Sequence, residues 1–159
     1  MTCSPSLRLS FPHNYLALFG FTVFLSFFTG VIVARYNALT VLIAVGVVSI
    51  LVVALSVFAS QTRVDFTTMH SMLFTLLVGL IVMGLLSVFF YSDFLRVVYA
   101  TLGAVVFSAY LCYDVQLLMG GKTYSLGPGE HVVGAMVLFL DIINLFLMIL
   151  QLVGLGRGE

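Results

Sequence analysis

The feature of this sequence that most constrains its fold is a series of long apolar stretches separated by short polar ones. A helix needs about 20 predominantly apolar residues to cross a bilayer, and several stretches reach that length. Only helices and closed barrels satisfy the backbone in lipid, and the stretches are far longer than the ~10-residue alternating segments of a barrel strand. The sequence therefore predicts an all-α, polytopic transmembrane helix bundle with about five spans, at roughly residues 15–33, 38–59, 71–90, 97–119 and 132–153.

The composition favours the same class. Of the 159 residues, 62% are hydrophobic and only 8% are charged. Ordinary soluble domains carry about 25% charged residues, so this chain has too little polar surface to cover a water-facing globule. We expect one membrane domain at residues 15–154, with an N-terminal tail at 1–14 and a C-terminal tail at 155–159. The expected partner is the lipid bilayer, and a net charge of zero gives no indication of nucleic-acid binding.

The polar residues just before the third apolar stretch have simple structural explanations. Asp65, Thr67 and Thr68 are residue types that cap helix N-termini. His70 could sense pH, because an unperturbed imidazole titrates near ~6.5, but a histidine at headgroup level is more often simply solvated. We therefore expect capping and interfacial anchoring in this segment.

Two aspartates resist such explanations. Asp114 lies inside the fourth apolar stretch and Asp141 near the middle of the fifth. Insertion scales give a cost of about 2.5–3.5 kcal/mol for an aspartate at a helix centre, and an ionisable residue within a membrane is by default a candidate functional residue. The structural alternative is a protonated carboxyl group that hydrogen-bonds a neighbouring helix.

The geometry of a helical hairpin brings the two aspartates to similar depths. A loop containing glycine and proline joins the fourth and fifth spans, so these helices should be antiparallel. At 1.5 Å per residue, Asp114 lies about 7–8 Å from Met119, and Asp141 lies about 13–14 Å from Val132. Side chains partly bridge the difference of about 6 Å. We therefore expect the two carboxyl groups to meet between the helices.

Further polar residues suggest a shared polar seam around this pair. Tyr110 is four residues before Asp114, whereas Asn144 and Gln151 are three and ten residues after Asp141. A tyrosine hydroxyl and an asparagine amide are the kinds of partner that a buried acid needs.

The chemistry of a buried acid pair is restricted. Two carboxyl groups in contact within a low dielectric cannot both ionise cheaply, so they should gain and lose protons as a unit. Carboxylate oxygens are also the ligands that Ca²⁺ prefers. The residues alone thus predict a proton-sensitive switch, a cation path, or both, with Asp114 and Asp141 as proton sensor or ion gate. We expect no cofactor and no permanent metal site, with Ca²⁺ only as a transient ligand or permeant ion.

An enzymatic role is not expected from this pair. Intramembrane aspartyl proteases also place two aspartates on adjacent spans, but with a Gly-x-Gly-Asp motif on the second helix. Here Asp141 follows Leu-Phe-Leu, and no later Pro-Ala-Leu element is present.

Four motifs in order carry a family resemblance: F-P-H-N-Y-L at 11–16, Q-T-R-V-D-F-T at 61–67, Y-D-V-Q-L-L-M-G-G at 113–121 and F-L-D-I-I-N-L-F-L-M-I-L-Q-L-V-G at 139–154. Over nearly its whole length the chain resembles the transmembrane Bax inhibitor motif family, and its lifeguard branch in particular. The resemblance implies a protein of the endoplasmic reticulum, the Golgi or another membrane, such as the plasma membrane or lysosome. It also implies Ca²⁺ leak, suppression of apoptosis and a pH-responsive gate whose paired aspartates map onto Asp114 and Asp141.

The chain also departs from that family. Members usually have six or seven hydrophobic segments, and this sequence begins just before the family's third, which suggests a truncated isoform, a partial gene model or a bundle completed by a partner. S-L-G-P-G-E at 125–130 replaces an acidic loop. The main alternative function is therefore a non-conducting protein that regulates membrane partners such as death receptors or calcium channels. A proton-coupled transporter is a third alternative.

Overall fold

A computed structural model describes residues 13–90, 92–127 and 130–159, and these ranges contain five long helices and no strand. The elements, in chain order, are α2 (His13–Val33), α3 (Ala38–Gln61), the 3₁₀ turn η1 (Phe66–Met69), α4 (His70–Phe89), α5 (Asp93–Met119) and α6 (His131–Arg157). Each long helix is apolar and long enough to cross a membrane. The expected all-α bundle is confirmed, while residues 1–12 of the expected N-terminal tail lie outside the described ranges.

Two helices are longer than their apolar stretches. α5 begins at Asp93 rather than near residue 97, and α6 continues to Arg157 rather than ending near residue 153. A negative charge in the first turn and a positive charge in the last turn both interact favourably with the helix dipole. A charged residue therefore ends the apolar stretch without ending the helix.

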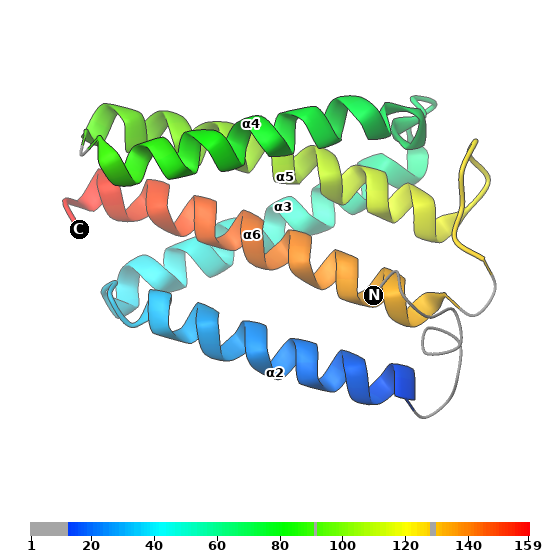
Figure 1. The fold of residues 1–159 in the computed structure, drawn as a ribbon, viewed down its shortest axis with the longest axis horizontal. Helices are drawn as coiled ribbons and strands as arrows, with labels where there is room; N and C mark the ends of the chain where they lie inside the picture. The colour runs from blue at the N-terminus through cyan, green and yellow to red at the C-terminus, as the bar shows by residue number, and fades with distance from the viewer. Residues whose placement is uncertain (1–12, 91, 128–129) are drawn as a thin grey trace.

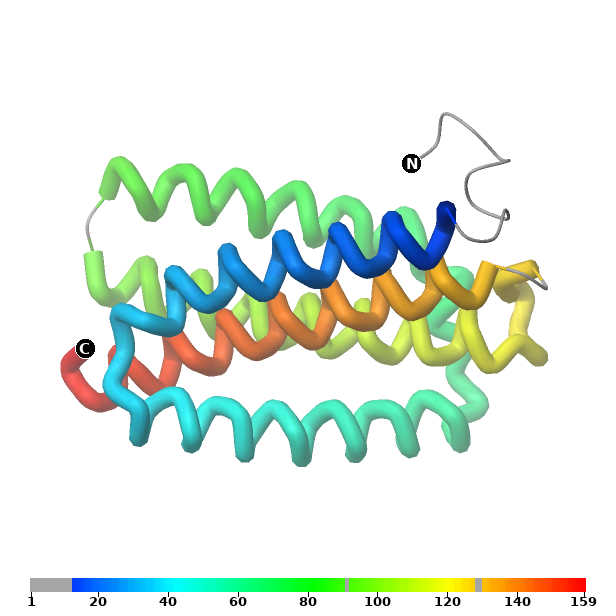
Figure 2. The backbone as a smooth tube through the Cα atoms, turned by 90° about the horizontal axis from the view of Figure 1, so that it is seen from below, coloured from blue at the N-terminus to red at the C-terminus, as the bar shows by residue number. Residues whose placement is uncertain are grey.

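The bundle is built around the antiparallel pair α5 and α6 (Figure 1). α3 packs against both of these helices, α4 packs on α5, and α2 packs on α6, as the perpendicular view also shows (Figure 2). Large apolar side chains are exposed along α2, α3 and α4. In a bilayer these side chains face lipid. Polar side chains within the spans must therefore lie between α5, α6 and the helices that pack on them.

The core near the bundle centre joins three helices. Leu80 of α4, Phe107 of α5, and Leu145 and Met148 of α6 form its buried cluster. Gly103 allows α6 to approach α5 closely here, because a Cβ atom at that position would lie 2.5 Å from Met148 Sδ. This close packing is the structural use of small residues in membrane helix interfaces.

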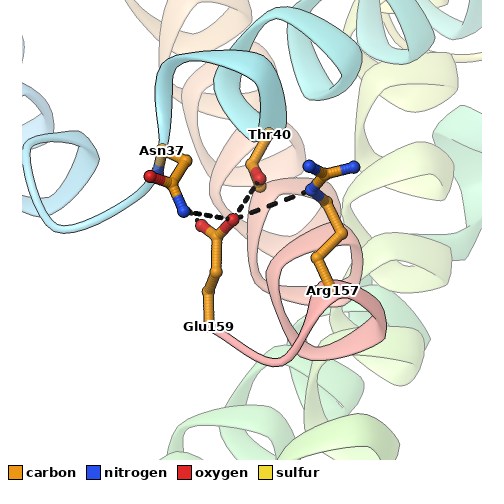
Figure 3. A network of polar contacts seen from close by, with 4 residues as sticks. All are labelled: Asn37, Thr40, Arg157 and Glu159. Carbon is orange, nitrogen blue, oxygen red and sulfur yellow. Dashed lines mark hydrogen bonds and ion pairs between the residues drawn. The ribbon is translucent and has the colours of Figure 1, made fainter.

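The far end of α6 is attached to the turn between α2 and α3 by Glu159 (Figure 3). Its Oε2 accepts a hydrogen bond from the Asn37 backbone N–H at 3.0 Å. Its Oε1 accepts from Asn37 Nδ2 and from Thr40 Oγ1, each at 2.7 Å, and lies 3.7 Å from Arg157 Nε. Asn37 is the N-cap of α3 but makes no capping bond with its own side chain, so the Glu159 carboxylate supplies the negative charge at this helix N-terminus.

Candidate functional site

Asp114 of α5 and Asp141 of α6 lie together between the two central helices. Each residue is only 5% exposed. Their side chains are within hydrogen-bonding reach of one another. The Oδ2 atom of each is buried and accepts no hydrogen bond from a described protein donor. An isolated buried carboxylate is very costly, so a proton held between the two groups would relieve both.

Both aspartates lie on the buried faces of their helices. On α5 the buried stripe includes Phe107, Leu111 and Asp114, which are spaced by four and three residues. On α6 it includes Asp141, Leu145 and Met148, again spaced by four and three. Residues at this spacing share one face of a helix, so each acid continues a core-facing stripe and points away from lipid.

A cavity of about 470 Å³ adjoins the pair, between α4, α5 and α6. Tyr110 and Asn144, two members of the expected polar seam, line it together with Asp114 and Asp141. Asn144 Nδ2 donates to the Leu140 carbonyl oxygen of its own helix at 2.9 Å, and no bond from it reaches the buried Oδ2 atoms of the two acids. The lining is therefore polar at the carboxyl groups but offers them few donors.

Gln151, the third expected member of the seam, lies elsewhere. It lines a different pocket, together with Ser87 and Arg96. Ten residues along an α-helix leave a side chain turned by about 80° from its starting direction, which is enough to move Gln151 off the face that carries Asp141. The structure thus brings four of the five proposed site residues together and separates Gln151 from them.

Two residues that the sequence analysis did not place in the seam also line the cavity. The Tyr113 hydroxyl lies 3.2 Å from His70 Nδ1, and the two rings lie 5.8 Å apart, centre to centre. His70 is exposed at the start of α4 and is close enough to Asp114 to interact with it electrostatically. Adjacent residues on a helix point about 100° apart, so the position of Tyr113 next to Asp114 gave no signal for its contact with His70.

Gln116 anchors the end of α5 that lies beyond Asp114. It is only 2% exposed. Its Oε1 accepts the Phe66 N–H at 2.8 Å, and its Nε2 donates to the carbonyl oxygens of Ala59 at 3.1 Å and Val64 at 2.9 Å. One buried amide therefore satisfies three backbone groups, one in the last turn of α3 and two in the segment that leads into α4.

Asp65 ties the same segment to the loop between α5 and α6. It caps η1, as expected, because its Oδ1 accepts from the Thr67 backbone N–H at 3.0 Å and from the Thr67 hydroxyl. Its Oδ2 accepts from the Thr123 hydroxyl at 2.6 Å and the Thr123 N–H at 3.1 Å. These bonds, that from the Thr123 hydroxyl first, hold the pKa of Asp65 down at about 2. These bonds thereby fix the loop end of the α5–α6 hairpin, near Asp114 and Asp141, to the segment between α3 and α4.

The aspartates offer few ligand atoms for a metal ion. In the described part of the chain, no three His, Cys, Asp or Glu side chains come close enough to hold a metal ion. Ca²⁺ takes 6–8 oxygen ligands in stable protein sites, and two carboxyl groups supply at most four.

Comparison with known proteins agrees with the motifs. The family model described as inhibitor of apoptosis-promoting Bax1 matches residues 1–158. Protein lifeguard 3 of Mus musculus and of Homo sapiens are each 34% identical to the chain over 158 residues, which is 97% of this chain and 51% of each relative. Protein lifeguard 4 of Mus musculus is 36% identical over 144 residues, which is 91% of this chain and 59% of that protein. The chain spans about half the length of these curated relatives, and it belongs to the family of inhibitors of apoptosis-promoting Bax1.

Proposed function

We propose that this membrane protein is a pH-responsive Ca²⁺ leak and a negative regulator of apoptosis. The observation that supports this proposal most is the buried pair Asp114 and Asp141 at the interface of the two central helices. Membership in a family of apoptosis inhibitors supports the regulatory role. We place the protein in the endoplasmic reticulum or Golgi, where release of stored Ca²⁺ would dampen death signals. We propose no enzymatic activity for it.

The proposed switch is the proton shared by the two carboxyl groups. With the proton in place, the pair carries a single negative charge and holds α5 against α6. Loss of that proton places two like charges together in a low dielectric, where repulsion is poorly screened. The energy of this repulsion would favour separation of the helices at the site, and the small residues that allow close packing, such as Gly103, lie on the same interface.

Other titratable groups face the pair and belong to the same switch. They are His70 of α4 and Tyr110 and Tyr113 of α5. A charge on His70 would stabilise an ionised Asp114, so the pH response of the pair depends on the protonation state of this exposed histidine.

The small number of carboxylate oxygens at this site suits an ion that passes through better than an ion that stays bound. Two carboxyl groups can replace only part of the hydration shell of Ca²⁺, so the ion would keep several waters and bind weakly. Conduction requires binding that is favourable enough for entry and weak enough for release. We therefore propose that Ca²⁺ is the transported ion and that it binds the aspartates only weakly as it passes.

Flux through reconstituted protein tests this proposal. Liposomes that contain a Ca²⁺ indicator and the purified chain should take up Ca²⁺ faster than empty liposomes, and the rate should change with pH. Asp141→Asn should remove most of the pH dependence, whereas Asp93→Asn, at an exposed position at the start of α5, should leave it unchanged. His70→Gln should shift the pH of the response without abolishing the flux.

Two results would contradict the proposal. Flux equal to that of empty liposomes would exclude a leak by this chain, and a pH profile untouched by Asp141→Asn would exclude the aspartate pair as its switch. Absent flux together with co-purification of a stoichiometric membrane partner would instead favour the non-conducting regulator of death receptors or calcium channels.

A further inference from the structure

The cavity beside the aspartates has a polar end and an apolar end. The polar end is lined by His70, Tyr113, Asp114 and Asp141. The apolar end is lined by Leu77, Leu80, Phe107 and Met148. Along α4 the lining runs from His70 to Ile81, and at 1.5 Å per residue this distance is about 16 Å. The volume of about 470 Å³ falls within the range of ~300–1,000 Å³ that is usual for small-molecule sites.

The polar end has the chemistry of a site for an organic cation. The buried Oδ2 atoms of Asp114 and Asp141 accept no hydrogen bond from a described protein donor. The rings of Tyr110 and Tyr113 lie beside them in an edge-to-face arrangement, with centres 6.5 Å apart. Aromatic faces attract ammonium groups, and a primary ammonium brings three hydrogen-bond donors. Among the described residues that line the cavity, none is lysine or arginine, and His70 is the one side chain there that can carry a positive charge.

The two ends together select the shape of the ligand. An inorganic cation would use only the carboxyl groups and would leave the apolar lining without a role. A neutral lipid tail would fill the apolar end but would leave the carboxyl oxygens without donors, which is costly when they are buried. A molecule with an ammonium head and a hydrocarbon tail satisfies both ends, and a pair of acids that shares one proton carries the single negative charge that one ammonium neutralises.

We propose that this cavity binds a cationic amphiphile, a single-chain amine whose ammonium group contacts Asp114 and Asp141 and whose tail lies against Leu80, Phe107 and Met148. The amine enters from the surrounding bilayer, and its head lies near the end of the bundle where His70 begins α4. This site adds a ligand to the protein and does not depend on Ca²⁺ conduction, because binding needs only the cavity and the charge of its acid pair.

Photolabelling in lipid nanodiscs tests the proposal. The probe is a dodecylammonium that carries a diazirine at the end of its tail, and the labelled residues are mapped by mass spectrometry of the full chain. Label should concentrate at Leu80, Phe107 and Met148, with exposed Phe24 of α2 as the reference for label delivered from bulk lipid. Unlabelled dodecylammonium should compete for the cavity positions, and dodecanol, which has the same tail without the charge, should compete about tenfold less well.

Two kinds of variant separate charge from shape. Asp114→Asn combined with Asp141→Asn keeps the volume of both side chains, removes the charge, and should reduce labelling of the cavity about tenfold relative to Phe24. Val137→Trp keeps both acids but fills the cavity one turn before Asp141, and it should reduce labelling by a similar factor. Val53→Trp is the matched control, because Val53 is exposed on α3 and lies outside the cavity lining.

Three outcomes would overturn the proposal: undiminished labelling in the double asparagine variant, equal competition by dodecanol, or equal loss of labelling in Val53→Trp and Val137→Trp. No ion gradient enters this assay, so a failed Ca²⁺ flux experiment leaves its result unaffected.

Discussion

Asp65 and Thr123 are separated by 58 residues in the chain, yet the carboxylate of Asp65 accepts hydrogen bonds from both the backbone N–H and the hydroxyl of Thr123. The same carboxylate caps η1 through Thr67. One half-buried side chain thus joins the connection before α4 to the loop that leads into α6. These contacts fix the end of the central hairpin that carries Asp114 and Asp141.

Asp65→Ala should release the loop between α5 and α6. The Thr123 N–H loses its acceptor and becomes free to exchange with solvent, so hydrogen exchange at Thr123 should accelerate. Asp93→Ala removes a carboxylate that lies 3.5 Å from Arg96 Nη1 at the opposite end of α5, and it should leave exchange at Thr123 unchanged. Equal exchange rates at Thr123 in the wild type and in Asp65→Ala would show that this link does not hold the loop.

Gln116→Leu should destabilise the protein by at least ~1–3 kcal/mol. The substitution places an apolar side chain of similar size in the buried position but leaves the Phe66 N–H and the carbonyl groups of Ala59 and Val64 without their partner. Thermal unfolding in detergent measures the loss. Gln151→Leu is the control, because Gln151 is only half-buried, and its effect should stay near ~0.5 kcal/mol. Equal effects of the two substitutions would contradict the anchoring role of Gln116.

Glu159 should make the stability of the bundle depend on acid pH. The bonds from Asn37, followed by that from Thr40, lower the pKa of Glu159 from 4.5 to about 2. A carboxyl group whose folded pKa is depressed contributes stability above its unfolded pKa, and this contribution is lost as the pH falls from about 4.5 toward 2.

The difference in melting temperature between the wild type and Glu159→Gln isolates this contribution, because the other acids are the same in both proteins. It should favour the wild type above pH 4.5 and shrink toward zero as the pH falls toward 2. A difference that stays constant over this window would show that the Glu159 carboxylate does not hold α6 to the start of α3.

Gly154→Ala should destabilise the protein, whereas Gly156→Ala should not. A Cβ atom at Gly154 would lie 2.5 Å from Cε1 of the Tyr36 ring, and a rigid ring can yield only by shifting as a whole. Overpacking of this kind costs about 1–3 kcal/mol. A Cβ atom at Gly156 meets nothing within 4 Å, so alanine there should gain up to ~1 kcal/mol from its better helix propensity. Equal unfolding free energies of the two variants would contradict the close contact between α6 and Tyr36.

The helices and the meeting of the two aspartates could be predicted from sequence because both depend on local quantities. The length of an apolar stretch sets the span, and the rise per residue with a short loop sets the depths of Asp114 and Asp141. Tyr110 and Asn144 line the same cavity because they lie within one turn of these acids. Gln151 is nearly three turns away from Asp141, and over that distance the rotation of the helix carries it to another pocket.

The remaining contacts join segments whose pairing leaves no local pattern. Glu159 binds Asn37 across 122 residues, and the Tyr113 hydroxyl contacts His70 across 43. In the sequence, nothing distinguishes Gln116 from other polar residues near the end of a span. Only the fold shows that its amide contacts the backbone around Val64. Such contacts depend on the order in which the helices pack, which hydropathy and spacing do not determine.

The most direct test of the central claim, that Asp114 and Asp141 act as one proton-sharing unit, is a double-mutant cycle on the pH dependence of Ca²⁺ leak in liposomes. The cycle compares the wild type, Asp114→Asn, Asp141→Asn and the variant that carries both substitutions. We predict that each single substitution removes the pH dependence and that the double variant behaves like either single one, because residues that act as a unit are strongly non-additive. Independent effects that simply add in the double variant, or a pH dependence that survives both single substitutions, would contradict it.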